Sequence, residues 1–251
     1  MPELPESAGA VVRRVRPLEL VVAPVAPAAV AAPTQAPVQR KRPLPGERRV
    51  QILQTLAAML EQPGSERITT AALAARLEVS EAALYRHFAS KAQMFEGLID
   101  FIETTVFTLV NQITEREAGG NVQAQRIVVM LLQFGEKNPG MARVMVGDAL
   151  VFEHERLSLR MNQFFDRVEG QLRQCLRRAA GPADGAADPV GPIGTLQFSD
   201  PPDTTAPSQV ANAVASGLTS LVIGRLQRFA RSGFRRSPTE HLPELLARLT
   251  P

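Results

Sequence analysis

Cysteine, tyrosine and tryptophan are scarce in this sequence, and these scarcities narrow the classes of structure and site it can form. There is one cysteine, one tyrosine and no tryptophan. Cys175 has no second cysteine to pair with, so nothing points to an oxidising compartment. The sequence also lacks a G-x-x-x-x-G-K-[ST] loop, a G-x-S-x-G elbow and any cluster of Cys and His. We therefore expect no enzymatic activity, no cofactor and no metal site.

The N-terminus is rich in Ala and Pro, and its run "LELVVAPVAPAAVAAP" is apolar enough to be compared with a signal sequence or a membrane span. Pro24, Pro27 and Pro33 would break a helix there, and the run is too short to cross a bilayer. We interpret residues 1–45 as a disordered basic arm that ends in "QRKRPLPGERR". We expect a cytoplasmic protein with no membrane partner.

Beyond the arm, apolar residues recur at spacings of three and four, with breaks rich in Gly and Pro between the segments. No segment shows the alternation of a β-strand, so the predicted fold class is all-α. The predicted domains are the arm (1–45), a three-helix helix-turn-helix domain (46–95) and a helical domain (96–251) with a disordered loop at 181–207. Outside the helix-turn-helix motif, helices are expected at about 47–60, 90–117, 122–137, 140–150, 155–180, 208–231 and 240–249.

The two long segments near the C-terminus carry the clearest pattern for helix packing. Segment 155–180 has an a/d-like apolar stripe over five turns, and segment 208–231 adds a row of small residues to its own apolar stripe. We expect both helices at a homodimer interface, although the same pattern also fits an intramolecular core. The apolar positions of the first segment are Leu157, Met161, Phe164, Phe165, Val168, Leu172, Cys175 and Leu176. Those of the second are Val210, Val214, Leu218, Leu221, Val222 and Phe229, and its small residues are Ala213, Gly217, Ser220 and Gly224.

The stretch "ITTAALAARLEVSEAALYRHFASKAQMFEGLI" has the pattern of two short helices, a tight joint and the start of a third helix. Thr69 and Thr70 are candidates to cap the first short helix. The letters "EVS" form the turn, in which Val79 fills the joint and Ser80 caps the second helix. The spacing therefore predicts a helix-turn-helix unit.

The second short helix has two different faces. Leu84 and Phe88 are four residues apart and must face the core. At 100° per residue, Ala82, Tyr85 and Arg86 point the opposite way. A helix held from behind, with small residues and hydrogen-bond donors in front, suits insertion into the DNA major groove.

The donors on and near this helix can be given roles on DNA. Tyr85 and His87 can donate to phosphate oxygens, Arg86 can reach a phosphate or a guanine edge, and Lys91 is placed to hold the flanking backbone. The net charge of +3 permits a nucleic-acid partner without establishing one. The alternative is an ordinary amphipathic helix with a solvated polar face. The candidate DNA-binding residues, including three arm residues for phosphate or minor-groove contacts, are Arg40, Lys41, Arg42, Thr69, Thr70, Ser80, Ala82, Tyr85, Arg86, His87 and Lys91.

At these residues the chain resembles the tetracycline-repressor family of regulators. The resemblance implies an N-terminal helix-turn-helix domain and a C-terminal helical domain for dimerisation and regulation, with a homodimer on a palindromic double-stranded DNA site. One position departs from the family, which usually has Gly in the turn where this chain has Glu78. If that residue adopts φ > 0, a glutamate there lowers the stability of the folded protein by about 1 kcal/mol relative to glycine.

The segments "LLQFGEKNPG" and "RMNQFFDRVEGQLRQCLR", and more loosely "RFARSGFRRSPTE", resemble the nucleoid occlusion factors within that family. This resemblance implies binding of the C-terminal tail of the division protein FtsZ in a groove between the fourth and fifth helices. Leu109 stands where a basic residue is usual, and Gln133 where a small one is. Apolar residues in the groove also fit a buried core. The residues that match the groove are Phe101, Met130, Lys137 and Asn138.

The expected function is that of a nucleoid-associated dimer that binds DNA and antagonises division-ring assembly over the chromosome. The resemblance also implies that DNA can gather more than one dimer, in an order it does not specify. The alternative within the same fold is a transcriptional repressor released by a small ligand. The scarcity of Trp and Tyr in the C-terminal half weakens the case for a ligand pocket. A third class, a pure protein-interaction module, would show no specific affinity for DNA.

Overall fold

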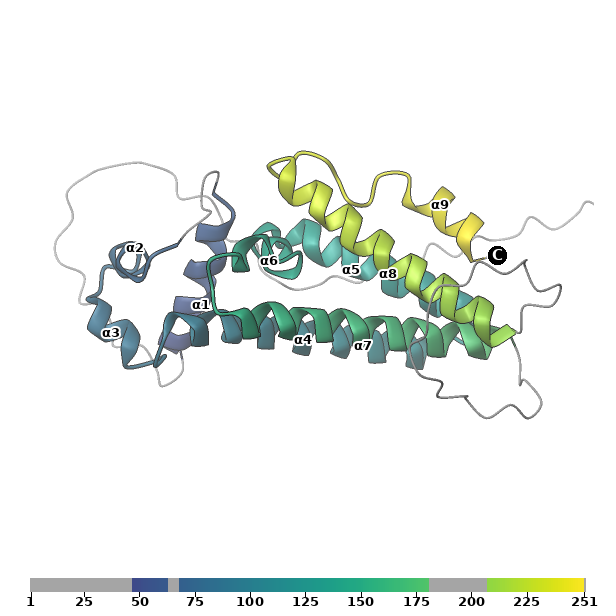
Figure 1. Ribbon diagram of the computed structural model, residues 1–251, viewed down its shortest axis with the longest axis horizontal. Helices are drawn as coiled ribbons and strands as arrows, with labels where there is room; N and C mark the ends of the chain where they lie inside the picture. Colours follow the sequence, from purple (N-terminus) through teal and green to yellow (C-terminus); the bar gives the residue numbers. More distant parts are fainter. Residues whose placement is uncertain (1–46, 63–67, 181–206, 251) are drawn as a thin grey trace, which may run out of the picture. The chain divides into compact units, whose positions relative to one another are not determined.

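In the computed structural model, residues 47–62, 68–180 and 207–250 are described, and all regular elements within these ranges are helices. The prediction of an all-α fold is confirmed. Arg40, Lys41 and Arg42 of the arm, and most of the predicted loop at 181–207, lie outside the described residues. In chain order (Figure 1) the elements are α1 (Glu47–Leu60), α2 (Thr70–Arg76), α3 (Glu81–Tyr85), α4 (Lys91–Arg116), α5 (Gly120–Lys137), α6 (Pro139–Met145), the 3-10 helix η1 (Asp148–Leu150), α7 (Glu155–Ala179), α8 (Pro207–Arg231) and α9 (Leu242–Leu249).

Short polar side chains begin the helices of the N-terminal part. The Thr69 hydroxyl accepts a hydrogen bond from the backbone N–H of Ala72 at 3.1 Å, and the Ser80 hydroxyl accepts one from Ala83 at 3.3 Å. Ser90 begins α4 in the same way. Each cap satisfies a backbone donor that the first turn of a helix leaves without a partner. The predicted cap residues Thr69 and Ser80 are therefore confirmed in that structural role.

Helix α7 contributes one apolar face to the core. Each of the eight apolar positions predicted along its stripe is buried, and the helix packs against α4, α5 and α8. The ring of Phe164 meets Phe107 of α4 edge-on, with 5.6 Å between ring centroids, and Phe165 at 5.1 Å. Offset and edge-to-face pairs of this kind add to the stability gained from burial alone.

Helix α8 divides its residues between the core and the surface. Leu218, Val222 and Phe229, which were expected at a dimer interface, are buried in the core of the single chain, whereas Val210 is 48% exposed. The row of small residues, which includes Gly217, lies on the exposed side over most of its length. The intramolecular interpretation therefore holds for the buried face of α8, and a dimer interface on its exposed face stays a prediction.

The segment 140–150 does not form the single helix that the sequence predicts. Helix α6 ends at Met145, and Gly147 adopts a left-handed conformation with φ of +80°. The short helix η1 then follows. Glycine adopts this conformation without the steric cost that a side chain brings, which the apolar periodicity of the segment does not reveal.

Helix α6 is fixed to α1 at very short range. A Cβ atom added to Gly140 would lie 2.2 Å from the backbone oxygen of Ala57, so the two backbones nearly touch. The buried Arg143 donates through Nη1 to the backbone oxygen of Leu60 at 3.2 Å, and through Nε to Asp148 at 2.8 Å. These contacts join the first helix of the N-terminal part to the helix that follows α5.

Glu78 in the turn between α2 and α3 adopts φ of +54°. This is the positive φ at which a glutamate is expected to be strained. We expect Glu78→Gly to be more stable than Glu78→Ala by about 1 kcal/mol, because glycine has no Cβ to strain in this region. Urea unfolding followed by circular dichroism measures the difference. Equal stability of the two variants would contradict a strained turn.

Candidate nucleic-acid and partner interfaces

Helix α3 is oriented as the sequence predicts. The side chains of Leu84 and Phe88 are 0% and 1% exposed, whereas Tyr85 is 45% exposed. Ala82 and Arg86 also lie at the surface. One face of the helix is therefore held by the core, and the opposite face carries a phenol and a guanidinium that can donate hydrogen bonds to DNA.

The remaining candidates in the motif are exposed or partly exposed, and several already have a partner. His87 is exposed at the end of α3. The Thr70 hydroxyl donates to the Glu81 carboxylate at 2.7 Å, which ties the first turn of α2 to the first turn of α3. The hydroxyls of Thr69 and Ser80 accept a bond as caps, and each keeps its O–H to donate. Both can contact a phosphate without losing the cap.

Arg49 of α1 belongs to the same surface, and the sequence analysis missed it. Its guanidinium lies over the Phe88 ring, 4.2 Å from the centroid, and Nη1 donates to the backbone oxygen of His87 at 3.2 Å. The side chain is thus fixed beside the end of α3 with further N–H groups available for a phosphate. The basic pair at the start of α1 was visible in the sequence, but not which of its members faces α3.

Lys91 is placed differently from the expectation. Its ammonium forms an ion pair with Glu153, which follows η1, and also lies 5.7 Å from the centroid of the Phe95 ring. The Glu153 side chain is only 9% exposed. Lys91 can contact the DNA backbone only if this pair opens or is shared with a phosphate.

The four residues predicted for the partner groove are not equally accessible. Phe101 of α4 is 40% exposed and Met130 of α5 only 8%. Lys137, the last residue of α5, is exposed. The side-chain amide of Asn138 donates to the backbone oxygen of Phe134 at 2.8 Å, which helps to end the helix.

Phe101 lies on the edge of α4 that faces away from α7. Arg160 of α7 pairs with Asp100 at 2.5 Å and Glu103 at 2.8 Å, and Arg156 pairs with Glu96 at 2.8 Å. At 100° per residue, these acidic positions form one row, and Phe101 lies well over 90° around the helix from it. The ring is thus available on a surface that α7 does not cover.

Comparison with known proteins agrees with this geometry. The family profile "Bacterial regulatory proteins, tetR family" matches residues 52–98, and the profile "Tetracyclin repressor-like, C-terminal domain" matches residues 120–187. A TetR transcriptional regulator from Legionella pneumophila has a similar fold, with a TM-score of 0.59 and 14% identity over 82% of this chain and 97% of that one. A putative TetR-family transcriptional regulator from Rhodococcus sp. also has a similar fold, with a TM-score of 0.58 and 16% identity over 82% of this chain and 100% of that one. The fold and the exposed face of α3 define a DNA-binding regulator of the tetracycline-repressor type.

Sequence relatives narrow the class further. The chain is 43% identical over 198 residues to the nucleoid occlusion factor SlmA of Marinomonas sp., covering 79% of this chain and 90% of the relative. It is 47% identical over 195 residues to the nucleoid occlusion factor SlmA of Idiomarina loihiensis, covering 77% of this chain and 89% of the relative. The chain belongs to the nucleoid occlusion factor SlmA family. Within the described ranges, no helix is long and apolar enough to span a membrane.

Tyr85→Phe removes one hydrogen-bond donor from the exposed face of α3 and leaves its buried face intact. We expect affinity to fall by up to about tenfold, and by the same factor on the preferred site and on unrelated duplex, because a phosphate contact does not read sequence. Fluorescence anisotropy with a site selected from random DNA measures both affinities. Gln174→Ala, on the exposed side of α7, is the control, and an equal loss there would contradict a local contact.

Glu153→Gln removes the carboxylate that pairs with Lys91. We expect the variant to bind DNA up to about fivefold more tightly, because the Lys91 ammonium, which is 24% exposed, then has no carboxylate to leave, and even an exposed ion pair contributes up to about 1 kcal/mol. Glu155→Gln removes the same charge from an exposed neighbouring position and corrects for the change in net charge. If the two variants bind DNA equally, Glu153 does not compete with DNA for Lys91.

Proposed function

We propose that this protein binds a palindromic DNA site as a homodimer and, while bound, engages the C-terminal tail of FtsZ, so that division-ring assembly is antagonised over the chromosome. The observation that carries the proposal is the pairing of an exposed donor face on α3 with 43–47% identity to SlmA proteins over most of the chain. The protein would then be associated with the nucleoid through its DNA contacts.

The surface of α8 supports the homodimer. Val210 is 48% exposed, and Ala213, Gly217 and Ser220 lie on the surface beside it. A Cβ atom added to Gly217 or Gly224 would meet nothing within 4 Å, so a helix of a second copy has room to approach closely. A two-fold axis there would relate two α3 helices, as two half-sites of a palindrome require.

Two features support a peptide site at α4 and α5. Phe101 offers an exposed ring, and Lys137 offers a cation that pairs with no carboxylate among the described residues. An apolar side chain and a carboxylate on one short peptide fit these two groups. Met130 can contribute only its exposed edge, because the rest of its side chain packs in the core. Leu109 packs against the core as well, whereas Gln133 is exposed.

Lys137→Glu reverses the charge at the end of α5. We expect a labelled peptide that copies the FtsZ C-terminus to bind the wild-type protein, and the variant to bind it at least about fivefold more weakly, because like charges replace an attraction. Fluorescence anisotropy with and without operator DNA measures the affinity. Arg248→Glu is the matched control, since it makes the same charge change on α9, whose end contacts the first half of α5 through the hydrogen bond from Gln125 to Thr250.

The peptide titration and a DNA titration at several salt concentrations separate the proposal from its two alternatives. No peptide binding at high micromolar concentration, with or without DNA, would favour a ligand-responsive repressor. A DNA affinity that is insensitive to salt would favour a pure interaction module. A protein that makes several phosphate contacts loses about 0.9 log units of affinity per contact for each log unit of salt.

A further inference from the structure

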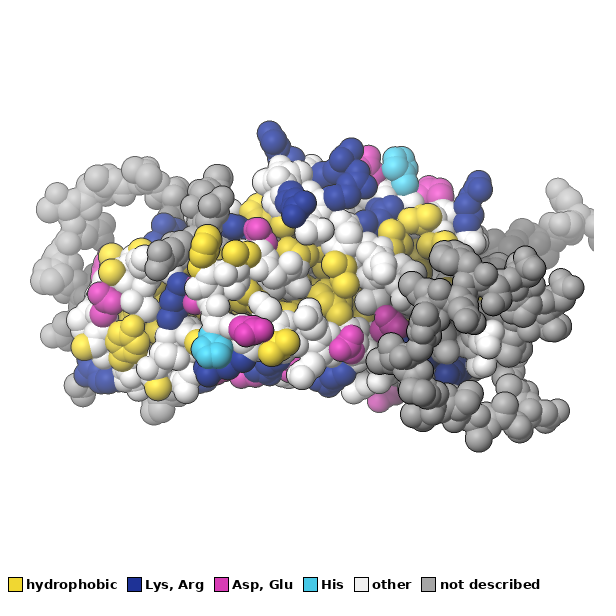
Figure 2. All heavy atoms as spheres, viewed as in Figure 1, with side chains coloured by type: hydrophobic (Ala, Val, Ile, Leu, Met, Phe, Trp, Pro, Cys, Tyr) yellow, Lys and Arg dark blue, Asp and Glu magenta, His cyan; other side chains and the backbone are white. Residues whose placement is uncertain are grey.

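Helix α8 and the loop that follows it carry an unusual concentration of one charge. From position 208 to 239 the sequence contains five arginines and no Asp, Glu or Lys. In Figure 2, basic side chains gather along the upper edge of the visible face, where Figure 1 shows the loop between α8 and α9. The arginines are Arg225, Arg228, Arg231, Arg235 and Arg236.

The loop is held by its own hydrogen bonds. The Ser232 hydroxyl donates to the backbone oxygen of Phe229 at 2.8 Å and accepts from the backbone N–H of Arg236 at 2.9 Å. Gly233 and Phe234 both adopt φ of +63°, and the Phe234 ring packs against Phe229 with 5.3 Å between centroids. The backbone that carries the arginines is therefore fixed at several points.

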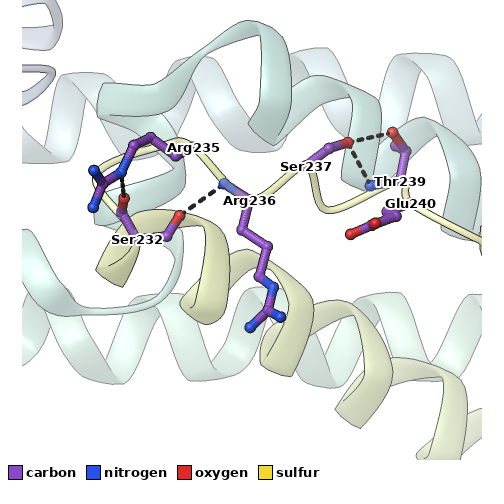
Figure 3. Close-up of a pocket in the computed structure, with 6 residues that line it drawn as sticks. All are labelled: Ser232, Arg235, Arg236, Ser237, Thr239 and Glu240. Atoms are coloured by element: carbon purple, nitrogen blue, oxygen red, sulfur yellow. Dashed lines mark hydrogen bonds between the residues drawn. The ribbon is translucent and has the colours of Figure 1, made fainter.

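Arg225 is the most strongly engaged of the five arginines in hydrogen bonds to the protein itself. Arg225 donates to the backbone oxygens of Pro238 at 2.9 Å and Glu240 at 2.6 Å. Arg235 uses only Nε, which donates to the backbone oxygen of Ser232 at 3.0 Å, and Figure 3 shows the Arg236 side chain extended over α8. The four arginines other than Arg225 are exposed, and none of them forms an ion pair with a carboxylate of the described residues.

Favourable interaction with the α8 dipole explains only part of this charge. Arg228 and Arg231 lie in the last turn of α8, where cations stabilise the negative end of a helix. Arg235 and Arg236 lie beyond the helix, where that effect falls off. They border an open hollow that also contains one acidic residue, Glu240 (Figure 3).

The loop is also tied to the end of α5 where Lys137 lies. The hydroxyls of Ser237 and Thr239 donate to the Glu136 carboxylate at 2.5 and 3.0 Å. Glu136 is therefore satisfied by two neutral donors and immediately precedes Lys137 in α5. The basic loop and the proposed peptide site are thus joined through neighbouring residues.

We propose that Arg235 and Arg236 form a second docking surface, which takes an acidic stretch of the same partner peptide that contacts Lys137. Arginine suits this role because its planar guanidinium donates two parallel hydrogen bonds to a carboxylate. An acidic peptide is favoured over a nucleic acid or a lipid surface by the link through Glu136. This inference rests on the proposed function, since it adds a flanking contact to the FtsZ tail site.

The test uses the full chain and three peptides: the FtsZ C-terminal peptide, and the same peptide with four glutamates added at its N-terminus or at its C-terminus. At low salt we expect one extended peptide to bind at least about fivefold more tightly than the unextended peptide. The gain should disappear in Arg235→Glu/Arg236→Glu and at about 0.5 M salt, where charges separated by more than a few ångströms are screened.

The matched control is Arg116→Glu/Arg248→Glu, which makes the same charge change at two other exposed positions. Melting curves confirm that both double variants fold. If the unextended peptide depends on Lys137 but neither extension adds affinity, this inference is wrong and the proposed function stands. If no peptide binds, the proposed function fails first. A loss of non-specific duplex binding in Arg235→Glu/Arg236→Glu, beyond that of the control and without any effect on peptides, would assign the surface to nucleic acid instead.

Discussion

The burial of Leu84 and Phe88 is the constraint on which the DNA-facing surface depends. Helix α3 has only five residues, too few to be stable by itself in water. Its position is therefore set by packing, and the two side chains that are fully buried decide which residues remain outside. Tyr85 and Arg86 face solvent because Leu84 and Phe88 cannot. Arg49 reinforces the arrangement from α1, since its guanidinium covers the outer face of the Phe88 ring.

Close packing around α1 also connects the helix-turn-helix motif to the proposed peptide site. Helix α1 supports the helix-turn-helix motif. Its last turns meet the backbone of α6 at Gly140 and accept a hydrogen bond from the Arg143 side chain. Helix α6 directly follows Lys137 and Asn138. Burial raises the pKa of Glu61, at the end of α1, although a hydrogen bond from Gly140 opposes the shift. The end of α1 is thus packed directly against the helix that follows Lys137 and Asn138.

Local periodicity predicted the helices well, whereas the choice of distant partners was not visible in the sequence. The α7 stripe and the two faces of α3 follow from the 3.6-residue repeat, whereas the expectation of strain at Glu78 came from the glycine that the family usually has there. The pairing of Lys91 with Glu153 joins residues 62 positions apart, and nothing near either residue indicates it. The burial of Met130 also depends on neighbouring helices, because an apolar residue at a helix edge fits a groove and a core equally well. These placements are decided by tertiary packing.

The positions of the unpaired positive charges say more about binding than the net charge does. A total of +3 says little, but Arg156 and Arg160 of α7 are neutralised by acidic residues of α4. Within the described ranges, the exposed cations without a carboxylate partner include Arg86 directly after α3, Lys137 at the end of α5, and Arg235 and Arg236 on the loop after α8. DNA phosphates and peptide carboxylates are both anions, so a protein that binds the two at once needs separate cationic surfaces.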